Sequence, residues 1–357
     1  MKQLTIILTL LLLITIGCNQ QKQPFNNSIK KEYTSIKGKV NKWHTDTVYM
    51  ATLPFHSPYS TYDDFKVISA DKAFEFKFDN IDKPFILLLT PERKFLDYRK
   101  FLLFESLTDK YYKGYCKDFY TKPMSTYIIE PGSETIVELT KISRYGETQM
   151  KILNENAYNL EYYQTTFDLD QRFDEVVTLA KTRDKAIEDL NNKRNELLIK
   201  LDKEKKYISP FLYKYVKAEI EFGARKEFLR YLMLDHKEET SQLFGNEIPT
   251  EINNVIKFNK ENVDYATLIS QEYNEFLELY LNFKFSELKN ELITYKEFDN
   301  EKFDFALKEL PQASKYYYLA NNLLYSVCTE QTKELFASLI VEYPQGELND
   351  RLSKKYN

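Results

Sequence analysis

The stretch Phe-Glu-Phe-Lys-Phe at positions 74–78 decides the fold of the first part of the chain, because apolar and charged residues alternate in it. A period of two is typical of a β-strand with one buried and one exposed face. Similar short patterns, separated by turn residues, lie on both sides of it, at 36–40, 47–53, 65–68, 85–89, 127–129 and 135–139. Residues 34–145 are therefore predicted to form a β module, an antiparallel β-sandwich or an open barrel.

Two of these segments predict finer detail. The run at 85–89, Phe-Ile-Leu-Leu-Leu, is apolar throughout, which is typical of a strand buried on both faces. The segment Glu130-Pro131-Gly132-Ser133 has the composition of a tight turn. We expect this turn to join the strands at 127–129 and 135–139 into a closing hairpin.

From residue 150 the apolar period changes to 3.6 and glycine almost disappears, with only 8 glycines in the 357 residues. Both features favour long helices. Residues 173–201 read as one helix whose apolar seam packs against a neighbouring helix of the same chain. Residues 150–357 are thus predicted to be an irregular α-helical domain and the whole chain an α+β protein, with further helices expected at 156–170, 211–234, 265–288, 302–310, 314–328 and 332–343.

The N-terminus carries an export signal. Lys2 precedes an apolar stretch at 4–16, which is too short to span a bilayer of about 30 Å and has the length of a signal-peptide core. Thr15-Ile16-Gly17-Cys18 then resembles a bacterial lipobox, and an ordinary secretory signal with an incidental cysteine is the alternative. We expect residues 1–17 to be a lipoprotein signal peptide, Cys18 to be the lipidated residue that attaches the chain to a membrane, and residues 18–33 to be a flexible tether.

The residue after Cys18 is Asn19, so a simple inner-membrane retention signal is absent, and no acidic export signal follows. The expected location is therefore the cell envelope, lipid-anchored, at the outer membrane and facing the periplasm. Basic and acidic residues are interspersed in a chain of net charge −4. This pattern argues against nucleic acid as a partner.

The order of the strand motifs resembles a known family. Ile-x-Gly-x-Val at 36–40, Thr-Val-Tyr-Met at 47–50, Phe-x-Phe-x-Phe at 74–78 and Tyr-Ile-Ile-Glu-Pro-Gly at 127–132 are similar to the β domain of unknown function that begins bacterial lipoproteins related to thioredoxin-like thiol–disulfide oxidoreductases of the AhpC/TSA type. The resemblance covers residues 34–140 and implies a β module, a helical segment after it and a location in the envelope. In those relatives a thioredoxin-like domain often follows, and we expect none in this chain.

The cysteines depart from that family. They lie at positions 18, 116 and 328, so no Cys-x-x-Cys pair exists, and the relatives' redox activity is not implied. Cys328 is expected in the core of an apolar helix. Cys116 lies among tyrosines and lysines in residues 91–126, an insertion relative to the family pattern, and is the candidate redox residue. This insertion is either a recognition loop or a loop packed against the helical domain.

The remaining candidates for chemistry are few. His44, His56 and His236 form no metal-binding spacing and are expected to be surface or turn residues. Glycine is too scarce for a phosphate-binding loop, and no nucleophile-elbow motif occurs. The sequence therefore predicts no cofactor, no metal site and no catalytic residue.

These observations favour a lipid-anchored cell-envelope protein that acts as a non-catalytic binding or scaffolding module. The alternative is an accessory component of periplasmic thiol–disulfide exchange, which either presents its two modules to a separate thioredoxin-like partner or uses Cys116 as a resolving thiol. An enzyme with an unrecognised cleft is the third interpretation.

Overall fold

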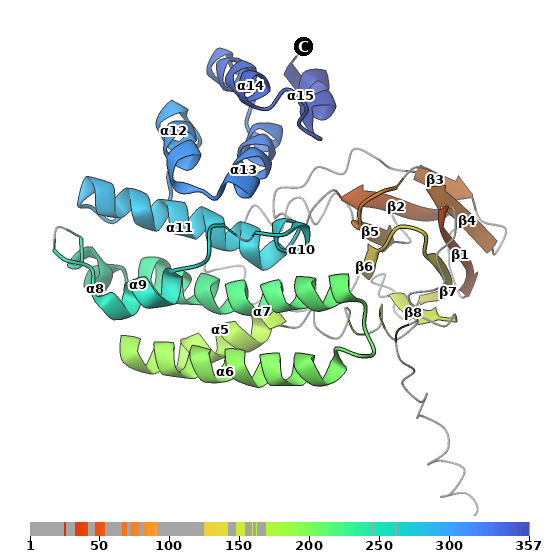
Figure 1. The fold of residues 1–357 in the computed structure, drawn as a ribbon, viewed down its shortest axis with the longest axis horizontal. Coiled ribbons are helices and arrows are strands. Elements are labelled where there is room, and N and C mark those ends of the chain that lie inside the picture. Colours follow the sequence, from red (N-terminus) through yellow and green to blue (C-terminus); the bar gives the residue numbers. More distant parts are fainter. Residues whose placement is uncertain are drawn as a thin grey trace, which may run out of the picture.

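The protein has an α+β fold in which the strands precede the helices along the chain, as predicted (Figure 1). The computed structural model describes residues 25, 33–41, 47–53, 66–69, 73–78, 81–90, 125–141, 148–153, 159, 162, 169–244, 246–261 and 263–356. Strands occupy the part up to residue 152, and helices occupy the part from residue 169 onward.

The described strands form two four-stranded sheets, with the orders β4-β1-β7-β8 and β3-β2-β5-β6. Their bounds are β1 Thr34–Asn41, β2 Thr47–Leu53, β3 Lys66–Ser69, β4 Ala73–Phe78, β5 Phe85–Thr90, β6 Ser125–Ile129, β7 Glu134–Lys141 and β8 Thr148–Ile152. The expectation of wholly antiparallel pairing is wrong, because β1 and β7 run parallel. Strand β8, Thr-Gln-Met-Lys-Ile, is absent from the predicted strands because its two apolar residues give only a short alternation.

The predicted turn at 130–133 exists, but the predicted hairpin around it is wrong. The Ser133 amide donates to the Glu130 carbonyl over 3.1 Å, and Gly132 has a φ of 72°, which glycine adopts without strain. The Gly132 amide also donates to Thr34 Oγ1 at 2.9 Å, at the start of β1. The turn is thereby attached to β1, so β7 pairs with β1 in one sheet while β6 pairs with β5 in the other.

Strand β4 has the buried face and the exposed face that the alternation predicted. Phe74 and Phe76 are buried, whereas Glu75 and Lys77 are exposed. In β5, Phe85, Ile86 and Leu87 are buried in succession, as the continuous apolar run predicted. The two neighbours of β5 in its sheet are β2 and β6.

Gly38 of β1 lies under the ring of Phe74. A Cβ atom at this position would come within 2.4 Å of Phe74 Cζ and 2.8 Å of Val137 Cγ2. The Gly38→Ala variant should therefore lose about 1–3 kcal/mol of unfolding free energy through overpacking, measurable by urea denaturation. If the clash is the cause, adding Phe74→Leu to Gly38→Ala recovers part of that loss. Simple additivity of the two losses would contradict it.

The helices form a layered bundle beside the strands, in which α5, α6, α7 and α11 lie side by side and α12 to α15 lie beyond α11 (Figure 1). Their bounds are α5 Leu169–Leu179, α6 Arg183–Glu204, α7 Pro210–Arg230, the π-helix η1 Tyr231–Asp235, α8 Lys237–Ser241, α9 Thr250–Ile256, α10 Tyr265–Leu268, α11 Gln271–Lys289, α12 Asn300–Glu309, α13 Gln312–Tyr325, α14 Glu330–Glu342 and α15 Asn349–Tyr356. The helix expected at 156–170 lies almost entirely outside the described residues.

The single helix predicted at 173–201 is wrong, because α5 ends at Leu179 and α6 begins at Arg183. Thr182 separates them with extended backbone, and its hydroxyl accepts from the Lys185 amide, as N-cap residues do. The apolar seam nevertheless continues across the break. Phe173, Ala180 and Leu197 are buried, and both helices pack against α7 of the same chain.

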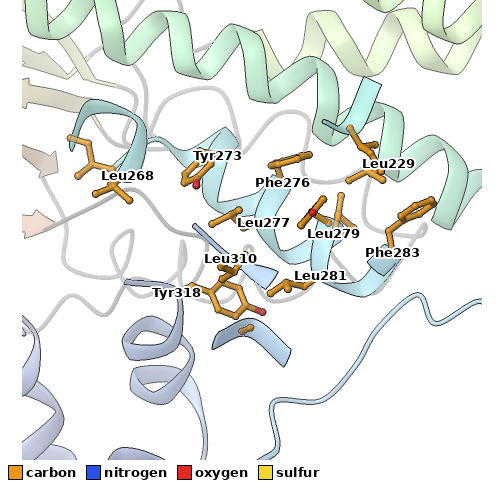
Figure 2. Packing of buried hydrophobic residues seen from close by; sticks show 14 of the residues in the cluster. Leu229, Leu268, Tyr273, Phe276, Leu277, Leu279, Leu281, Phe283, Leu310 and Tyr318 are labelled. Carbon is orange, nitrogen blue, oxygen red and sulfur yellow. The ribbon is translucent and has the colours of Figure 1, made fainter. Parts of the chain in front are cut away.

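The core of the bundle lies between α7, α11 and α13 (Figure 2). Tyr273, Phe276 and Phe283 of α11 are completely buried, and Figure 2 shows them along one side of that helix with Leu229 of α7 nearby. Ile128 of β6 belongs to the same apolar cluster. The helical core thus extends onto one of the sheets.

Polar contacts also join the strands to the helices, through what we call the junction cluster: Glu130, Asn159 and Ser209. The Ser209 hydroxyl donates to Glu130 Oε1, and Asn159 Nδ2 donates to the same oxygen at 3.3 Å. Asn159 Oδ1 in turn accepts from the Ser209 amide at 2.7 Å. Ser209 is fully buried and also caps α7 by accepting from the Leu212 amide.

Replacing Ser209 by alanine should loosen the junction cluster. Ser209→Ala removes both the cap of α7 and a hydroxyl bond to a carboxylate, so we expect a loss of about 1–3 kcal/mol and faster amide exchange in the turn at 130–133. Ser270→Ala is the matched control, because Ser270 is an equally buried N-cap whose hydroxyl donates to Glu219 within the bundle. Equal exchange in that turn for both variants would contradict the role assigned to Ser209.

Candidate functional site

Most residues singled out in the sequence lie outside the described residues. These are Cys18, the predicted lipidation site, Cys116, the candidate redox residue, and both His44 and His56. Residues 91–124 of the insertion lie outside them too. The predictions that rest on these residues therefore stay predictions.

Cys328 is described, and its expected position in the core of a helix is wrong. Helix α13 ends at Tyr325, and α14 begins at Glu330 with a capping box between Thr329 and Thr332. Cys328 lies in the connection between these helices, where its thiol is exposed and free. Its neighbour Val327 is exposed as well.

A cavity of about 330 Å³ lies at the end of the bundle where η1 leads into α8. Figure 1 places α8 at the end of the bundle away from the strands. The start of α6 closes the cavity from the other side. Its wall consists of residues 181–184, Tyr231 and Leu232 of η1, and His236, Glu239, Thr240 and Leu243.

The π-helical turn shapes this wall. The His236 amide donates to the Tyr231 carbonyl at 3.0 Å, five residues back, which widens the helix by one residue at the end of α7. The Thr240 hydroxyl donates to the Leu232 carbonyl at 2.7 Å and so holds α8 against η1. Single π-turns inside or at the end of α-helices occur frequently at functional sites.

Two buried polar atoms in the wall have no hydrogen-bond partner among the described residues: the Tyr231 hydroxyl and Arg183 Nε. Tyr231 is 2% exposed, and its ring lies 4.0 Å from that of His236, measured between centroids. Arg183 Nε is 3.9 Å from Asp184 Oδ1, beyond hydrogen-bond distance. Both atoms are closed off from solvent, so neither faces the open cavity.

The charges around these donors are mixed. Lys181 and Arg183 are positive, whereas the carboxylates of Asp184 and Glu239 are negative and lie in solvent, with side chains 86% and 79% exposed. Burial raises the pKa of the Tyr231 hydroxyl above its ordinary value, and the charge of Glu239 raises it further, while Arg183 lowers it. The hydroxyl thus stays protonated and able to donate at neutral pH.

The described residues of the cavity do not form a metal-binding site. Nowhere in the described ranges do three or more His, Cys, Asp or Glu side chains gather in a metal-binding arrangement. His236 follows η1 in a turn, as predicted for a turn residue, and its nearest carboxylate is Glu239, 3.9 Å from Nδ1.

No family model matches the chain, and no match was found among curated proteins or solved structures. Over the described part of the chain, no helix combines the length and the apolarity needed to cross a bilayer.

The sequence holds one signal for the start of α6. Thr182 followed by Arg183 and Asp184 is a helix-start pattern, but it lies inside an apparently continuous apolar seam. The π-turn at 231–235 has no sequence signal of its own, because Tyr-Leu-Met-Leu continues the apolar pattern of α7.

The raised pKa of Tyr231 predicts how this residue affects stability in alkali. Its folded pKa exceeds the unfolded value near 10, so its contribution is complete below pH 10 and is lost as the pH rises through the folded pKa. Tyr231→Phe should therefore reduce the fall in unfolding free energy above pH 10, measured by denaturation at stepwise pH. An unchanged pH dependence in Tyr231→Phe would show that this hydroxyl ionises normally.

Proposed function

We propose that the protein is a lipid-anchored component of the bacterial cell envelope, attached through Cys18 at the outer membrane, and that it serves there as a non-catalytic binding or scaffolding module. The observation that carries this proposal is the junction cluster. It joins the strands to the helical bundle by hydrogen bonds. This joint fixes the surface of the strands and the surface of the helices relative to each other and to the anchor at Cys18.

Further contacts across the same boundary support the proposal. The Tyr265 hydroxyl donates to the Pro84 carbonyl at 3.1 Å, and Lys83 pairs with Glu347. The first contact joins the residues just before β5 to α10, and the second joins them to the turn before α15. A module that positions partners benefits from several such contacts, because domains joined by few contacts move independently.

The proposal also includes the way in which the two sheets pack. We interpret the two sheets as a sandwich, and the rings of Phe78 in β4 and Phe85 in β5, 4.9 Å apart between centroids, support packing between them. This interpretation agrees with the resemblance to the β domain of thioredoxin-related lipoproteins. That resemblance rests on the motifs at 36–40, 74–78 and 127–132.

The alternative function, an accessory role in thiol–disulfide exchange with a thioredoxin-like partner, is favoured by one observation. Cys328 exposes a free thiol in the connection between α13 and α14. A mixed disulfide with a partner needs such an accessible thiol.

Two measurements on the whole chain in cells test the proposal. Labelled palmitate should be incorporated, and the Cys18→Ala variant should lose both the label and the membrane fraction. Capture from membranes after mild crosslinking should retain specific partners, which Ser209→Ala loses and Ser270→Ala keeps.

Three results would count against this proposal. A chain that takes up no palmitate is not a lipoprotein, and partners retained equally by Ser209→Ala would remove the role of the junction cluster. A thioredoxin-like protein captured as a mixed disulfide through Cys116 or Cys328 would favour the alternative function.

A further inference from the structure

The N-terminal part of the chain is attached beside the connection between α6 and α7. Phe25 is half-buried, and its amide donates to the Lys206 carbonyl at 3.1 Å. Strand β1 begins close by, because Thr34 bonds to the turn at 130–133, which the junction cluster attaches to the start of α7. Figure 1 shows the α6–α7 connection at the end of the bundle next to the strands.

The predicted tether before this attachment is short. Seven residues, 18–24, lie between the start of the expected mature chain at Cys18 and Phe25. A fully extended chain spans at most ~3.6 Å per residue, so these residues reach no further than about 25 Å. A lipid anchor on Cys18 therefore keeps the α6–α7 connection within that distance of the membrane surface.

This end of the bundle is positively charged. The segment 199–217, which we call the basic end, contains six lysines, and all of them are exposed: Lys200, Lys203, Lys205, Lys206, Lys214 and Lys217. Against its two acids, Asp202 and Glu204, they give the segment a net charge of +4 in a chain of net charge −4. Two acids from outside, Glu196 and Asp264, pair with Lys200 and Lys214, and counting them leaves a net charge of +2.

The tip of the basic end combines lysines with an aromatic and an aliphatic side chain. Tyr207 is half-buried, and Lys206 Nζ lies 4.7 Å from the centroid of its ring. Ile199 is 57% exposed and precedes Lys203 by one turn of α6, so both lie on one face of that helix. Tyrosines and lysines with apolar stems are typical of the boundary between a bilayer and water.

We propose that the basic end faces the membrane and contacts anionic phospholipid headgroups, with Lys203, Lys205 and Lys206 beside the phosphates and with Tyr207 and Ile199 at the bilayer boundary. This inference rests on the proposed lipid anchor and names the surface that the anchor brings to the bilayer. Each lysine near an anionic surface adds only a small attraction, which fades within a Debye length. The basic end therefore orients an anchored chain and does not replace the anchor.

The orientation has a consequence for the rest of the bundle. Helices α12 to α15 lie on the side of α11 away from α6 (Figure 1). With the basic end against the membrane, these helices and the exposed thiol of Cys328 lie away from the bilayer, where a soluble protein can reach them.

Lysine acetylation of the lipidated chain in vesicles tests this orientation. The chain is reconstituted in phosphatidylcholine, either alone or mixed with phosphatidylglycerol, and labelled with a water-soluble acetylating reagent. On the anionic vesicles, labelling of Lys203, Lys205 and Lys206 should fall about fivefold, the factor that corresponds to one lysine held at an anionic surface. Lys308 of α12 and Lys333 of α14, both exposed, should label equally on both vesicles. Raising the salt concentration should remove the protection.

Two double variants locate the contact. Lys203→Gln combined with Lys206→Gln should remove most of the protection of Lys205, because two of the three charges at the tip are lost. Lys308→Gln combined with Lys333→Gln is the matched control, since it removes the same charge from α12 and α14, and Lys205 should stay protected. All four side chains are exposed, so neither variant should unfold at a lower temperature.

The proposal is overturned if Lys203, Lys205 and Lys206 label equally on both vesicles. It is also overturned if Lys308 and Lys333 gain the same protection, or if the two double variants behave alike. Palmitate uptake without protection of the basic end would reject only this inference. Absence of palmitate would reject the lipid anchor, and the orientation with it.

The partner capture described above is a separate measurement. Protection of the basic end in a chain that retains no partners would support the orientation and reject only the scaffolding function.

Discussion

The hydrogen bonds of Ser209 connect most of the structure. Its hydroxyl bonds to Glu130 in the turn between the two sheets and caps α7 at the same time. Helix α7 is the helix against which α5, α6, α9, α10 and α11 all pack. One buried serine therefore joins the turn that connects the two sheets to the central helix of the bundle.

Buried charges add a second constraint inside the bundle. Lys226 of α7 lies 2.8 Å from Glu272 of α11 and 3.3 Å from its neighbour Glu227, and all three side chains are almost completely buried. Lys302 of α12 likewise pairs with Glu278 of α11 at 2.6 Å. Such pairs contribute little net stability because both charges lose water. A register shift that separates either pair, however, leaves a buried charge unpaired, so these contacts select one alignment of the helices.

The sequence predicts where the strands and helices lie better than it predicts which of them pair or pack together. The alternation at 74–78 and the apolar run at 85–89 identified β4 and β5 with the correct faces, because burial on a strand follows directly from period. The turn at 130–133 was also recognisable, whereas its attachment to Thr34 depends on a contact across the fold. The helices were predicted too long at 173–201 and 265–288, since the caps Thr182 and Ser270 interrupt patterns whose apolar residues stay buried on both sides.

The candidate site was less accessible to prediction. His236 was expected in a turn, but nothing in the sequence places it beside Tyr231 or brings Arg183 to the same cavity, because a π-turn and a helix start meet there only in three dimensions. Cys328 was expected in the core because its neighbours are apolar. The capping box at Thr329 and Thr332 instead places it between helices.

The parallel pairing of β1 with β7 has a consequence for how the chain matures. Ser35 lies opposite Glu134, so the first strand meets this neighbour only after ~100 further residues have emerged, and such distant pairing slows folding. Until then the unpaired edge of β1 is open to other chains. A chain that emerges with its N-terminus first thus leaves this edge of β1 unpaired until β7 has been made.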